Sequence, residues 1–566
     1  MFLKMSSPVP QLLGRGLRSV ITRFQPRSRF NRRQRFSTVA AAVEVVEDRR
    51  VLSTFTVSNL NDSGEGSLRD AIAAANANPG ADLIHFQRRL AGTITLTTGQ
   101  MEITDDLTIQ GNGAHRLTIS GNETSRVFQM GGAETDVEMK DLTIANGRSM
   151  VKEDVGITLT RGGGILNDGG VLTLSRVTMR NNQAIDIISG DVSSDVVGGG
   201  AVANTGNGKL TATHCRFIGN VVSGGLRYAF GGAIANVSDS IAVIENSVFV
   251  RNEAMGGSTS YGGAIGNFGS SQLTISGSTF RSNTARASNS LTASAQEAFG
   301  GAIATRPGTV VSSGSTTTID RSLFIGNRAL GGAAGDGETG GDAGGGALYS
   351  VASTLTADRS RFLRNHVVGG DGGIAGGNAW GGAIEATAVS STDLPLTRID
   401  TSLFSGNRVR GGAADGQNGT AAGGALFNSF GQMDISQSRI LNNGARTRNG
   451  GDALGGGIFN GESFNDVSAV LNINNSSVIR NFAHGRSGSN GQGGGIYNGN
   501  QFAGTNPVVT MTQTRVVANR ATGGIRGQGI GGGIYTVGTF NFTGGLLRGN
   551  HASTSEKDIF GILTPV

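Results

Sequence analysis

Residues 262–285 read Gly-Gly-Ala-Ile-Gly-Asn-Phe-Gly-Ser-Ser-Gln-Leu-Thr-Ile-Ser-Gly-Ser-Thr-Phe-Arg-Ser-Asn-Thr-Ala, and variants of this stretch recur along the chain. Successive copies lie 31 to 45 residues apart. A fixed unit joined by loops of variable length is typical of a solenoid, in which each repeat is stabilised by stacking on its neighbours. The glycine before the aliphatic step falls at Gly164, Gly200, Gly232, Gly263, Gly301, Gly346, Gly382, Gly424, Gly457, Gly495 and Gly533.

Turn residues divide one unit into three short strands, around Ile265, around 273–275 and around Phe280. Stacking the units would place Ile265 beneath Ile303 and Phe280 beneath Phe324. We therefore predict an all-β fold, a right-handed single-stranded parallel β-helix of about fourteen rungs, roughly 65 Å long. The asparagine of Phe-x-x-Asn is expected to sit at a left-handed corner and to bond its amide to the next rung.

Composition narrows the class of protein. The 566 residues include 94 Gly but only 8 Pro, which argues against collagen and against a disordered linker. Residues 1–36 carry nine Lys or Arg and no acid, so the other residues hold 38 basic and 41 acidic side chains, a net charge of −3. A nucleic-acid-binding protein carries its positive charge on the folded body. We therefore do not expect a nucleic-acid partner.

The single cysteine excludes an internal disulfide. Cys215 occupies a slot that other repeats fill with Ser or Thr, such as Ser247 and Thr514. We interpret it as a small buried residue that replaces serine. The alternative is a reactive thiol, for which His214 is the basic neighbour.

The chain divides into four regions. Residues 1–53 are predicted to be a basic export leader, disordered or cleaved, with a mitochondrial-type presequence as the competing interpretation. Residues 54–147 are predicted to form a cap and the first irregular rungs, 148–552 the repeat β-helix and 553–566 a terminal strand or tail. Within the cap, Ser67 is expected to N-cap a helix that ends near Asn76. The sequence holds no run of eighteen apolar residues, so we expect no membrane-spanning helix.

Three motifs resemble those of known bacterial proteins. Residues 46–53 are similar to a short element near the start of planctomycete-type secreted proteins. Residues 61–72 resemble the CSLREA-type module that precedes β-helical repeats, with Gly66 in place of its first cysteine. Gly-Gly-Ala-Ile paired with Phe-x-x-Asn resembles the repeats of chlamydial polymorphic outer-membrane proteins. The resemblance covers roughly residues 54–564 and implies a pectate-lyase-like β-helix and a role in adhesion, whereas export is the expectation from the leader and the 46–53 element.

One set of residues is a candidate reactive site. Asp320, Asp358 and Asp400 are expected to stack in three successive rungs, with Arg321 and Arg359 beside them. Converging carboxylates and a basic residue are what hydrolysis or lyase chemistry requires, and they are the weak catalytic candidates of this chain. The alternative is a hydrogen-bonded corner, because Ser or Thr fills the same slot in other repeats.

No cofactor is expected, although Ca²⁺ is an open possibility. Glycine–aspartate loops at 331–346 and 369–377 resemble calcium-binding nonapeptide repeats, but they alternate irregularly. A solvated loop is the other interpretation. His366 and His551 share a slot five rungs apart, which is too far for one metal ion.

A row of aromatic residues is the candidate ligand-binding site. Phe427, Phe459, Tyr497 and Tyr535 each follow an inward aliphatic residue, so strand alternation predicts that they face solvent. Rings exposed in a row bind sugars or a protein partner. The alternative is that they stack on one another beneath a loop. A second set precedes the glycines and consists of Phe230, Tyr261, Phe299 and Trp380.

Together these patterns predict a secreted or cell-surface protein, extracellular or associated with the outer membrane. Its expected role is non-catalytic adhesion or structure, with an extracellular polysaccharide or cell-surface protein as partner and a monomer as its state. An enzyme is the less favoured interpretation, as a polysaccharide lyase or glycoside hydrolase acting in a lateral groove. A groove in which carboxylates and Arg or Lys converge would favour the enzyme.

Overall fold

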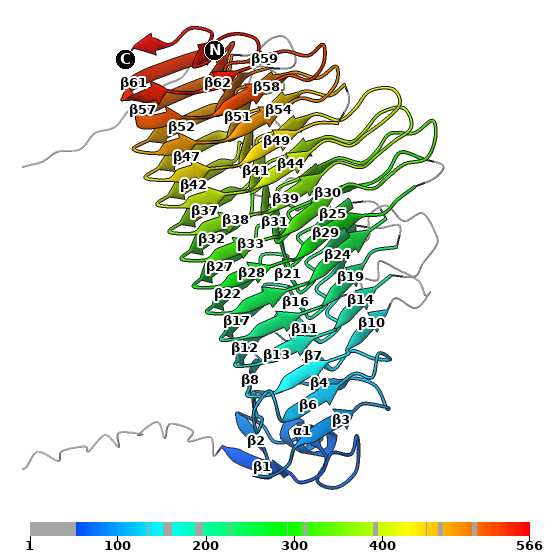
Figure 1. Ribbon diagram of the computed structural model, residues 1–566. Coiled ribbons are helices and arrows are strands. Elements are labelled where there is room, and N and C mark those ends of the chain that lie inside the picture. Colours follow the sequence, from blue (N-terminus) through cyan, green and yellow to red (C-terminus); the bar gives the residue numbers. More distant parts are fainter. Residues whose placement is uncertain are drawn as a thin grey trace, which may run out of the picture. The chain divides into compact units, whose positions relative to one another are not determined.

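The computed structural model describes residues 52–565, apart from 133–134, 151–160, 187–195, 226–227, 258, 291–292, 309–313, 389–393, 449, 462–467 and 501–505. Contacts divide the chain into Met1–Arg49 and Arg50–Val566. The predicted leader and most of the 46–53 element lie outside the described residues. In the second unit, short strands pair in parallel with their counterparts one repeat away (Figure 1). The predicted parallel β-helix is confirmed, and one of its sheets has 14 strands.

Each regular coil contributes five strands where we predicted three. The example coil is formed by β26 (Ile265–Phe268), β27 (Gln272–Ser276), β28 (Thr279–Arg281), β29 (Thr284–Ala287) and β30 (Glu297–Phe299). Like strands of successive coils form four parallel sheets of 28, 14, 12 and 10 strands, which we call sheets A to D. The strands equivalent to β29 and β30 were missed because their two to four residues carry too little pattern to separate them from loop.

Sheet A takes two strands from most coils. Its first set comprises β1 (Ser53–Val57), β2 (Asp82–Phe86), β5 (Leu107–Gln110), β8 (Asp136–Lys140), β12 (Val171–Ser175), β17 (Lys209–Thr213), β22 (Ile241–Glu245), β27, β32 (Thr316–Asp320), β37 (Thr354–Asp358), β42 (Leu396–Asp400), β47 (Gln432–Ser436), β52 (Val470–Asn474), β57 (Val508–Val517), β61 (Thr539–Arg548) and β64 (Thr564–Pro565). Its second set comprises β3 (Gly92–Thr95), β6 (Leu117–Ser120), β9 (Thr143–Ala145), β13 (Thr178–Arg180), β18 (Arg216–Ile218), β23 (Val248–Val250), β28, β33 (Leu323–Ile325), β38 (Arg361–Leu363), β43 (Leu403–Ser405), β48 (Arg439–Leu441) and β53 (Ser477–Ile479).

Sheets B, C and D take one strand from a coil. Sheet B comprises β4 (Met101–Ile103), β7 (Phe128–Gly131), β11 (Ile165–Asp168), β16 (Val202–Thr205), β21 (Ile234–Val237), β26, β31 (Ile303–Arg306), β36 (Leu348–Val351), β41 (Ile384–Thr387), β46 (Leu426–Ser429), β51 (Ile458–Gly461), β56 (Ile496–Gly499), β60 (Ile534–Thr536) and β63 (Ile559–Phe560). Sheet C comprises β10 (Arg148–Met150), β14 (Gln183–Ile185), β19 (Val221–Ser223), β24 (Glu253–Gly256), β29, β34 (Arg328–Leu330), β39 (His366–Val368), β44 (Arg408–Arg410), β49 (Gly444–Arg446), β54 (Phe482–His484), β58 (Arg520–Thr522) and β62 (His551–Ala552). Sheet D comprises β15 (Val196–Gly198), β20 (Tyr228–Phe230), β25 (Thr259–Tyr261), β30, β35 (Ala343–Gly344), β40 (Ala379–Trp380), β45 (Ala421–Ala422), β50 (Ala453–Leu454), β55 (Gly491–Gln492) and β59 (Gly529–Ile530).

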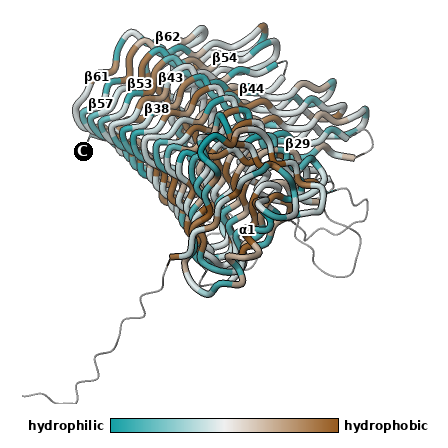
Figure 2. The backbone as a smooth tube through the Cα atoms, turned by 90° about the horizontal axis from the view of Figure 1, so that it is seen from below, coloured by the Kyte–Doolittle hydropathy of each residue, from teal (hydrophilic) through white to brown (hydrophobic). Residues whose placement is uncertain are grey.

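The core runs through the coils as columns of like residues, and Figure 2 shows bands of similar hydropathy that continue from coil to coil. Phenylalanines form the column that the repeat predicts. Successive rings lie 4.5–4.9 Å apart and within 7° of parallel, which confirms the prediction. The column consists of Phe217, Phe249, Phe280, Phe324, Phe362 and Phe404.

Asparagines form a second column with the predicted amide ladder, but their predicted left-handed conformation is wrong. The left-handed residue is the one before each asparagine, such as Arg364 with φ 52° before Asn365. Asn365 donates its Nδ2 to Asn407 Oδ1 at 3.0 Å and to the carbonyl of Phe324 at 3.1 Å, while its own Oδ1 accepts from the Asn327 backbone. The same pattern links Asn182, Asn220, Asn252, Asn283, Asn327, Asn365, Asn407, Asn443, Asn481, Asn519 and Asn550. Each amide therefore satisfies buried backbone groups and holds two coils in register.

The two glycines at the start of each coil are required for different physical reasons. Gly262 has φ +64°, a left-handed conformation that a side chain would strain. A Cβ on Gly263 would lie 2.4 Å from the Gly301 carbonyl oxygen and 2.4 Å from the Thr284 backbone. The second glycine is thus required by close approach, where the start of sheet B meets sheet C.

The N-terminal end is closed by α1 (Leu68–Asn76), as predicted. The Ser67 hydroxyl caps the helix by accepting from the Asp70 backbone N–H at 3.2 Å. Arg69 ties the helix to the next coil through Asp62 and the Gly99 and Gln100 carbonyls. The apolar face of α1 joins the main core, and Figure 1 shows the helix in the lowest, blue coil. Among the described residues, no helix is both long and apolar enough to cross a membrane.

Candidate functional site

The three aspartates proposed as a reactive site stack in register. Asp320 pairs with Asp358 across β32 and β37, and Asp358 pairs with Asp400 across β37 and β42. Arg359 contacts Asp320 at 2.7 Å and Asp358 at 3.0 Å, and Arg321 contacts Asp320 at 2.9 Å. The column is therefore an ion-paired surface ladder.

The contacts of this ladder do not favour general acid chemistry. Hydrogen bonds from Ser436 and Thr401 keep the pKa of Asp400 below its ordinary value. A general acid needs the opposite shift. Arg321 and Arg359 both lie at left-handed corners with φ 44°. A catalytic role for the three carboxylates stays a prediction, and the observed contacts are those of an ion-paired corner.

The aromatic row does stack, but its predicted exposure is wrong. Successive rings of Phe427, Phe459, Tyr497 and Tyr535 lie 4.7–5.1 Å apart, nearly parallel. The first three are 2%, 0% and 5% exposed, and only Tyr535 is half-buried. These side chains do point away from the coil interior, as alternation requires. Sheet D covers them, and a prediction based on three strands per coil had no place for that layer.

The two aromatic sets turn out to be the two sides of one packed layer. In each coil, a residue of sheet D packs near the sheet B residue five positions later. Where sheet D supplies a large ring, sheet B supplies Ala in two coils, and where sheet B supplies the ring, sheet D supplies Ala or Leu in two others. The pairs are Phe230 with Ala235, Phe299 with Ala304, Ala422 with Phe427 and Leu454 with Phe459. Trp380 is the exception, because the sheet B residue five positions later is Glu385. The row therefore fills volume between sheets, and its ligand-binding role stays a prediction.

The glycine–aspartate loops form closely packed arms that extend from sheets C and D. The Gly370 N–H donates to the Gly341 carbonyl of the neighbouring arm at 2.8 Å. Within single arms, Gly341 donates to Gly332 and Gly377 to Gly370, each at 2.9 Å. A Cβ on Gly370 would lie 1.7 Å from the Gly332 carbonyl oxygen. Glycine is thus required by backbone packing. In the described residues no group of three or more His, Cys, Asp or Glu is placed to hold a metal ion, and calcium binding stays a prediction.

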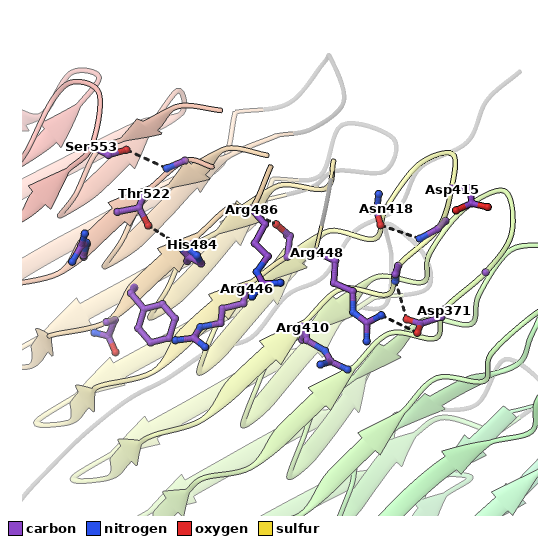
Figure 3. Close-up of a pocket in the computed structure, with 18 of the residues that line it drawn as sticks. Asp371, Arg410, Asp415, Asn418, Arg446, Arg448, His484, Arg486, Thr522 and Ser553 are labelled. Carbon is purple, nitrogen blue, oxygen red and sulfur yellow. Dashed lines mark hydrogen bonds and ion pairs between the residues drawn. The ribbon is translucent and has the colours of Figure 1, made fainter. Parts of the chain in front are cut away.

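A groove of about 1490 Å³ lies on the outer face of sheet C, bounded by the arms (Figure 3). It runs from Ala334, just beyond β34, to Ser553, just beyond β62. That path crosses six coil-to-coil steps, or about 29 Å. Its charged lining comprises Arg410, Arg446, Arg448, Arg480, Arg486 and Arg520 with His484, against Asp336, Asp371 and Asp415.

Two columns of residues run along the outer face of sheet C at the groove, and the members that line it are Arg410, Arg446, Phe482, His484, Arg520 and Thr522. In register along sheet C, the first column is Arg408, Gly444, Phe482, Arg520 and His551, and the second is Arg410, Arg446, His484 and Thr522. His366 precedes Arg408 in the first column, so the predicted five-rung separation from His551 is confirmed. The middle residue of each strand points the other way, into the Ala- and Val-lined contact with sheet D.

Phe482 is held between two arginines at the centre of the floor. The guanidinium of Arg408 lies 4.9 Å from the ring centroid and that of Arg446 lies 4.8 Å away. Gly444 makes this possible, because a Cβ there would lie 2.2 Å from the ring. The arrangement is a half-buried aromatic ring held by two cations.

Positive charge dominates the groove. Burial, followed by Arg448, lowers the pKa of Arg410, and burial, followed by Arg446, lowers the pKa of Arg408. Burial and the neighbouring Arg446, Arg486 and Arg520 lower the pKa of His484. Burial is the main cause of each lowered pKa, and the neighbouring arginines add to it.

One ion pair crosses the groove in the part of the chain that the structure describes. Arg448 contacts Asp371 at 3.0 Å, and Figure 3 shows the two side chains meeting between sheet C and an arm. Asp371 also accepts from the Ala413 backbone. His484 Nδ1 is 2.7 Å from the Thr522 hydroxyl, which fixes the imidazole.

Sequence reasoning missed this groove. The available signal was the alternation just after the ladder asparagines, in Asn-Arg-Val-Arg (407–410), Asn-Gly-Ala-Arg (443–446), Asn-Phe-Ala-His (481–484) and Asn-Arg-Ala-Thr (519–522). A polar side chain stands three places after the asparagine in all four segments, and arginine also stands one place after it in two of them, with Ala or Val between. A fourth strand with an outward basic face follows from that pattern.

Comparison with curated proteins finds a partial sequence similarity to an outer membrane protein. No family model matches this chain. It is 27% identical over 207 residues to outer membrane protein B of Rickettsia rickettsii, covering 31% of this chain and 12% of that protein. The chain thus spans about an eighth of the length of that curated relative.

Three solved structures are similar at low identity. One is the catalytic unit of an α-1,3-glucanase from Streptomyces thermodiastaticus, at 13% identity over 79% of this chain and 66% of that one, TM-score 0.36. Another is tailspike protein 3 of bacteriophage CBA120, at 12% over 80% and 56%, TM-score 0.34. The third is PfbA, a surface adhesin of Streptococcus pneumoniae, at 12% over 86% and 92%, TM-score 0.32. We assign no functional role to any residue of this chain from these three structures.

Proposed function

We propose that this chain is a secreted or cell-surface β-helical protein that binds a polysaccharide without cleaving it, in the groove on sheet C. The observation that carries the proposal is the groove itself, which continues over successive coils with Phe482 held at its centre. A site that repeats its backbone every ~4.8 Å offers similar positions to each unit of a polymer.

The floor of the groove has the chemistry of carbohydrate recognition. Phe482 is half-buried on the groove floor, and the part of its ring that the two arginines leave exposed is an apolar contact for the C–H groups of a sugar. Arginine, histidine and threonine side chains around it donate to hydroxyl and acidic oxygens. The groove is long enough to contact several sugar units at once.

Support for a surface location comes from the sequence. The partial similarity to an outer membrane protein and the resemblance to polymorphic outer-membrane protein repeats both concern proteins of bacterial surfaces. We extend that location, and the adhesive role implied by the resemblance, to this chain as part of the proposal.

A polysaccharide lyase or hydrolase is the second candidate, favoured by one observation. Asp371, Asp336 and Asp415 share the groove with arginines, as a lateral-groove enzyme would require. Against it, Asp371 is already bound by Arg448 and by the Ala413 backbone. An ion-paired carboxylate is a poor proton acceptor or nucleophile until that pair is broken.

Binding and product release separate the two candidates. The full chain is incubated with a panel of plant, algal and bacterial polysaccharides, and we expect retention on at least one polymer with no new reducing ends and no unsaturated products. Phe482→Ala should weaken that binding about tenfold, because the apolar contact of the ring with the sugar is lost. Tyr228→Ala, which removes a half-buried ring of β20 outside the groove, is the matched control. Product formation by the unaltered chain, or full binding by Phe482→Ala, would contradict the proposal.

A further inference from the structure

We infer that the polymer bound in the groove is anionic, a polysaccharide that carries a carboxylate or sulfate on successive sugars. This inference rests on the proposed function and names its ligand class. It is drawn from the charge, spacing and fixation of the arginines on the groove floor.

The first argument is a contrast of charge. The groove lining holds six arginines and three aspartates, a net charge of +3 with histidine neutral. The residues after position 36 together carry a net charge of −3. Positive charge is thus concentrated at the groove although the residues after position 36 are net negative. Such a local positive charge attracts an anionic ligand and speeds its association.

The second argument is that most of this charge has no internal counterion. Within the described part of the chain, Arg448 is the groove arginine that forms an ion pair, with Asp371. Arg410, Arg446, Arg486 and Arg520 are exposed at the groove. Like charges held on neighbouring coils repel one another, and a bound anion removes that cost.

The third argument is spacing. Arg410 and Arg446 stand opposite each other in adjacent strands β44 and β49, one coil apart, with His484 the next coil along. A coil step of ~4.8 Å is comparable to the advance of one sugar unit in an extended polysaccharide. Acidic groups on consecutive sugars would therefore meet consecutive members of this column.

The fourth argument is fixation. Arg446 is packed on the Phe482 ring, which fixes the plane of its guanidinium before ligand binds. A guanidinium stacked in this way keeps its N–H edge free for a carboxylate or sulfate. Arg408, the other cation on this ring, donates to the Asn407 and Asn442 carbonyls and holds the ring in place. Prearranged donors lose little entropy on binding.

A single-stranded nucleic acid is the other polyanion to consider. Such ligands are bound by a series of aromatic platforms along a basic groove. Within the described groove lining, Phe482 is the one aromatic ring. The observations therefore favour an acidic polysaccharide, and nucleic acid becomes an outcome of the test.

The test compares polymers that differ in charge on the full chain. Polygalacturonate and alginate represent carboxylates, dextran sulfate represents sulfates, and dextran and carboxyl-reduced polygalacturonate represent neutral chains. We expect at least one anionic class to bind about tenfold or more tightly than the neutral polymers, with affinity falling as salt rises. The two anionic arms identify which acidic group the groove prefers.

Arginine variants test whether binding of the anionic polymer depends on the groove floor. Arg410→Gln and Arg446→Gln should each lower affinity for the preferred anionic polymer about tenfold, because each removes a charge-assisted hydrogen bond. Arg281→Gln combined with Arg361→Gln removes two exposed arginines of sheet A and should change nothing. Arg410→Lys keeps the charge but loses the planar fork, so an intermediate loss is expected. His484 offers a separate readout, since its imidazole resonance should titrate at higher pH once an anion is bound.

The outcomes distinguish this inference from the proposed function. Equal binding of neutral and anionic polymers, with no effect of the arginine variants, would overturn the ligand class and leave the polysaccharide groove intact. Failure of every polymer to bind would overturn both. Tighter binding of a single-stranded oligodeoxynucleotide than of any polysaccharide would overturn the ligand class in favour of nucleic acid.

Discussion

Cys215 shows how one residue adapts to a column built for another. Other coils place a serine at this corner, whose hydroxyl accepts from the backbone of the preceding coil and donates to a carbonyl two residues earlier. Cys215 keeps the donor role, with its Sγ 3.4 Å from the Thr213 and Leu174 carbonyls. It is 1% exposed, and burial raises the pKa of its thiol to about 12. The interpretation as a buried serine replacement is confirmed.

This residue gives a pH-dependent prediction. The pKa of the Cys215 thiol is raised in the folded chain above its unfolded value of 9.0, so its stabilising contribution is complete below pH 9 and is lost as pH rises towards about 12. Relative to Cys215→Ser, the unaltered chain should lose about 1.4 kcal/mol of unfolding free energy per pH unit in that window. Parallel denaturant curves at several pH values measure the difference. A thiol reagent should label Cys215 only after unfolding, and rapid labelling of the folded chain would contradict the prediction.

At the scale of elements, the layer between sheets B and D is the unexpected feature. Sheet D contributes two or three residues per coil, yet it decides whether the neighbouring sheet B side chains are buried or exposed. Large and small residues exchange sides along the stack, with Phe230 on sheet D in one coil and Phe427 on sheet B in another. In both coils one large ring fills the layer between the sheets, and only the sheet that supplies it differs.

A double-mutant cycle tests this exchange. Phe427→Ala should cost about 4 kcal/mol of unfolding free energy by opening a cavity, and Ala422→Phe should cost about 2 kcal/mol by overpacking. The double variant recreates the Phe230–Ala235 arrangement and should be at least about 1 kcal/mol more stable than the sum predicts. Denaturant unfolding of the four chains measures the coupling. Phe427→Ala combined with Cys215→Ser is the distant control and should be additive, and additive behaviour of the 422/427 pair would refute the exchange.

The residue columns that repeat at fixed spacing could be predicted from the sequence, whereas the short strands of sheets C and D could not. Phe280, Asn283 and Gly263 recur at fixed offsets, so stacking, ladder and fold followed directly from the repeat. Phe427 was placed on the correct side of its strand but wrongly assigned to solvent, because the covering strand β45 is two alanines. The groove was missed for the same reason, since its floor is built on three-residue strands that continue into loops of variable length.

At the scale of the whole described body, each coil bonds mainly to the coils before and after it. Strand pairing in every sheet follows this rule, with β28 between β23 and β33 as one instance. Stability in such a stack is a sum of coil and interface terms, so damage stays near its origin.

Local damage is the prediction at this scale. Phe324 is fully buried, and its ring stacks at 4.8 Å on Phe280 and at 4.9 Å on Phe362. Phe324→Ala should accelerate amide hydrogen exchange in β28, β33 and β38 while leaving α1 unchanged. Thr356→Ala, on the outer face of β37 in a neighbouring coil, is the control and should have little effect in either place. A uniform increase along the chain would show that the body unfolds as one cooperative unit.

The column of asparagines also has a direction. Every Nδ2 points to the following coil and every Oδ1 to the preceding one, so the aligned amides form an electric dipole along the axis, positive towards the C-terminal end. Its negative end accepts the Gly147 N–H through Asn182 Oδ1, and its positive end meets the Asp558 carboxylate, 2.8 Å from Asn550 Nδ2. A coil can therefore join this stack in only one polarity, and the two ends attract opposite charges.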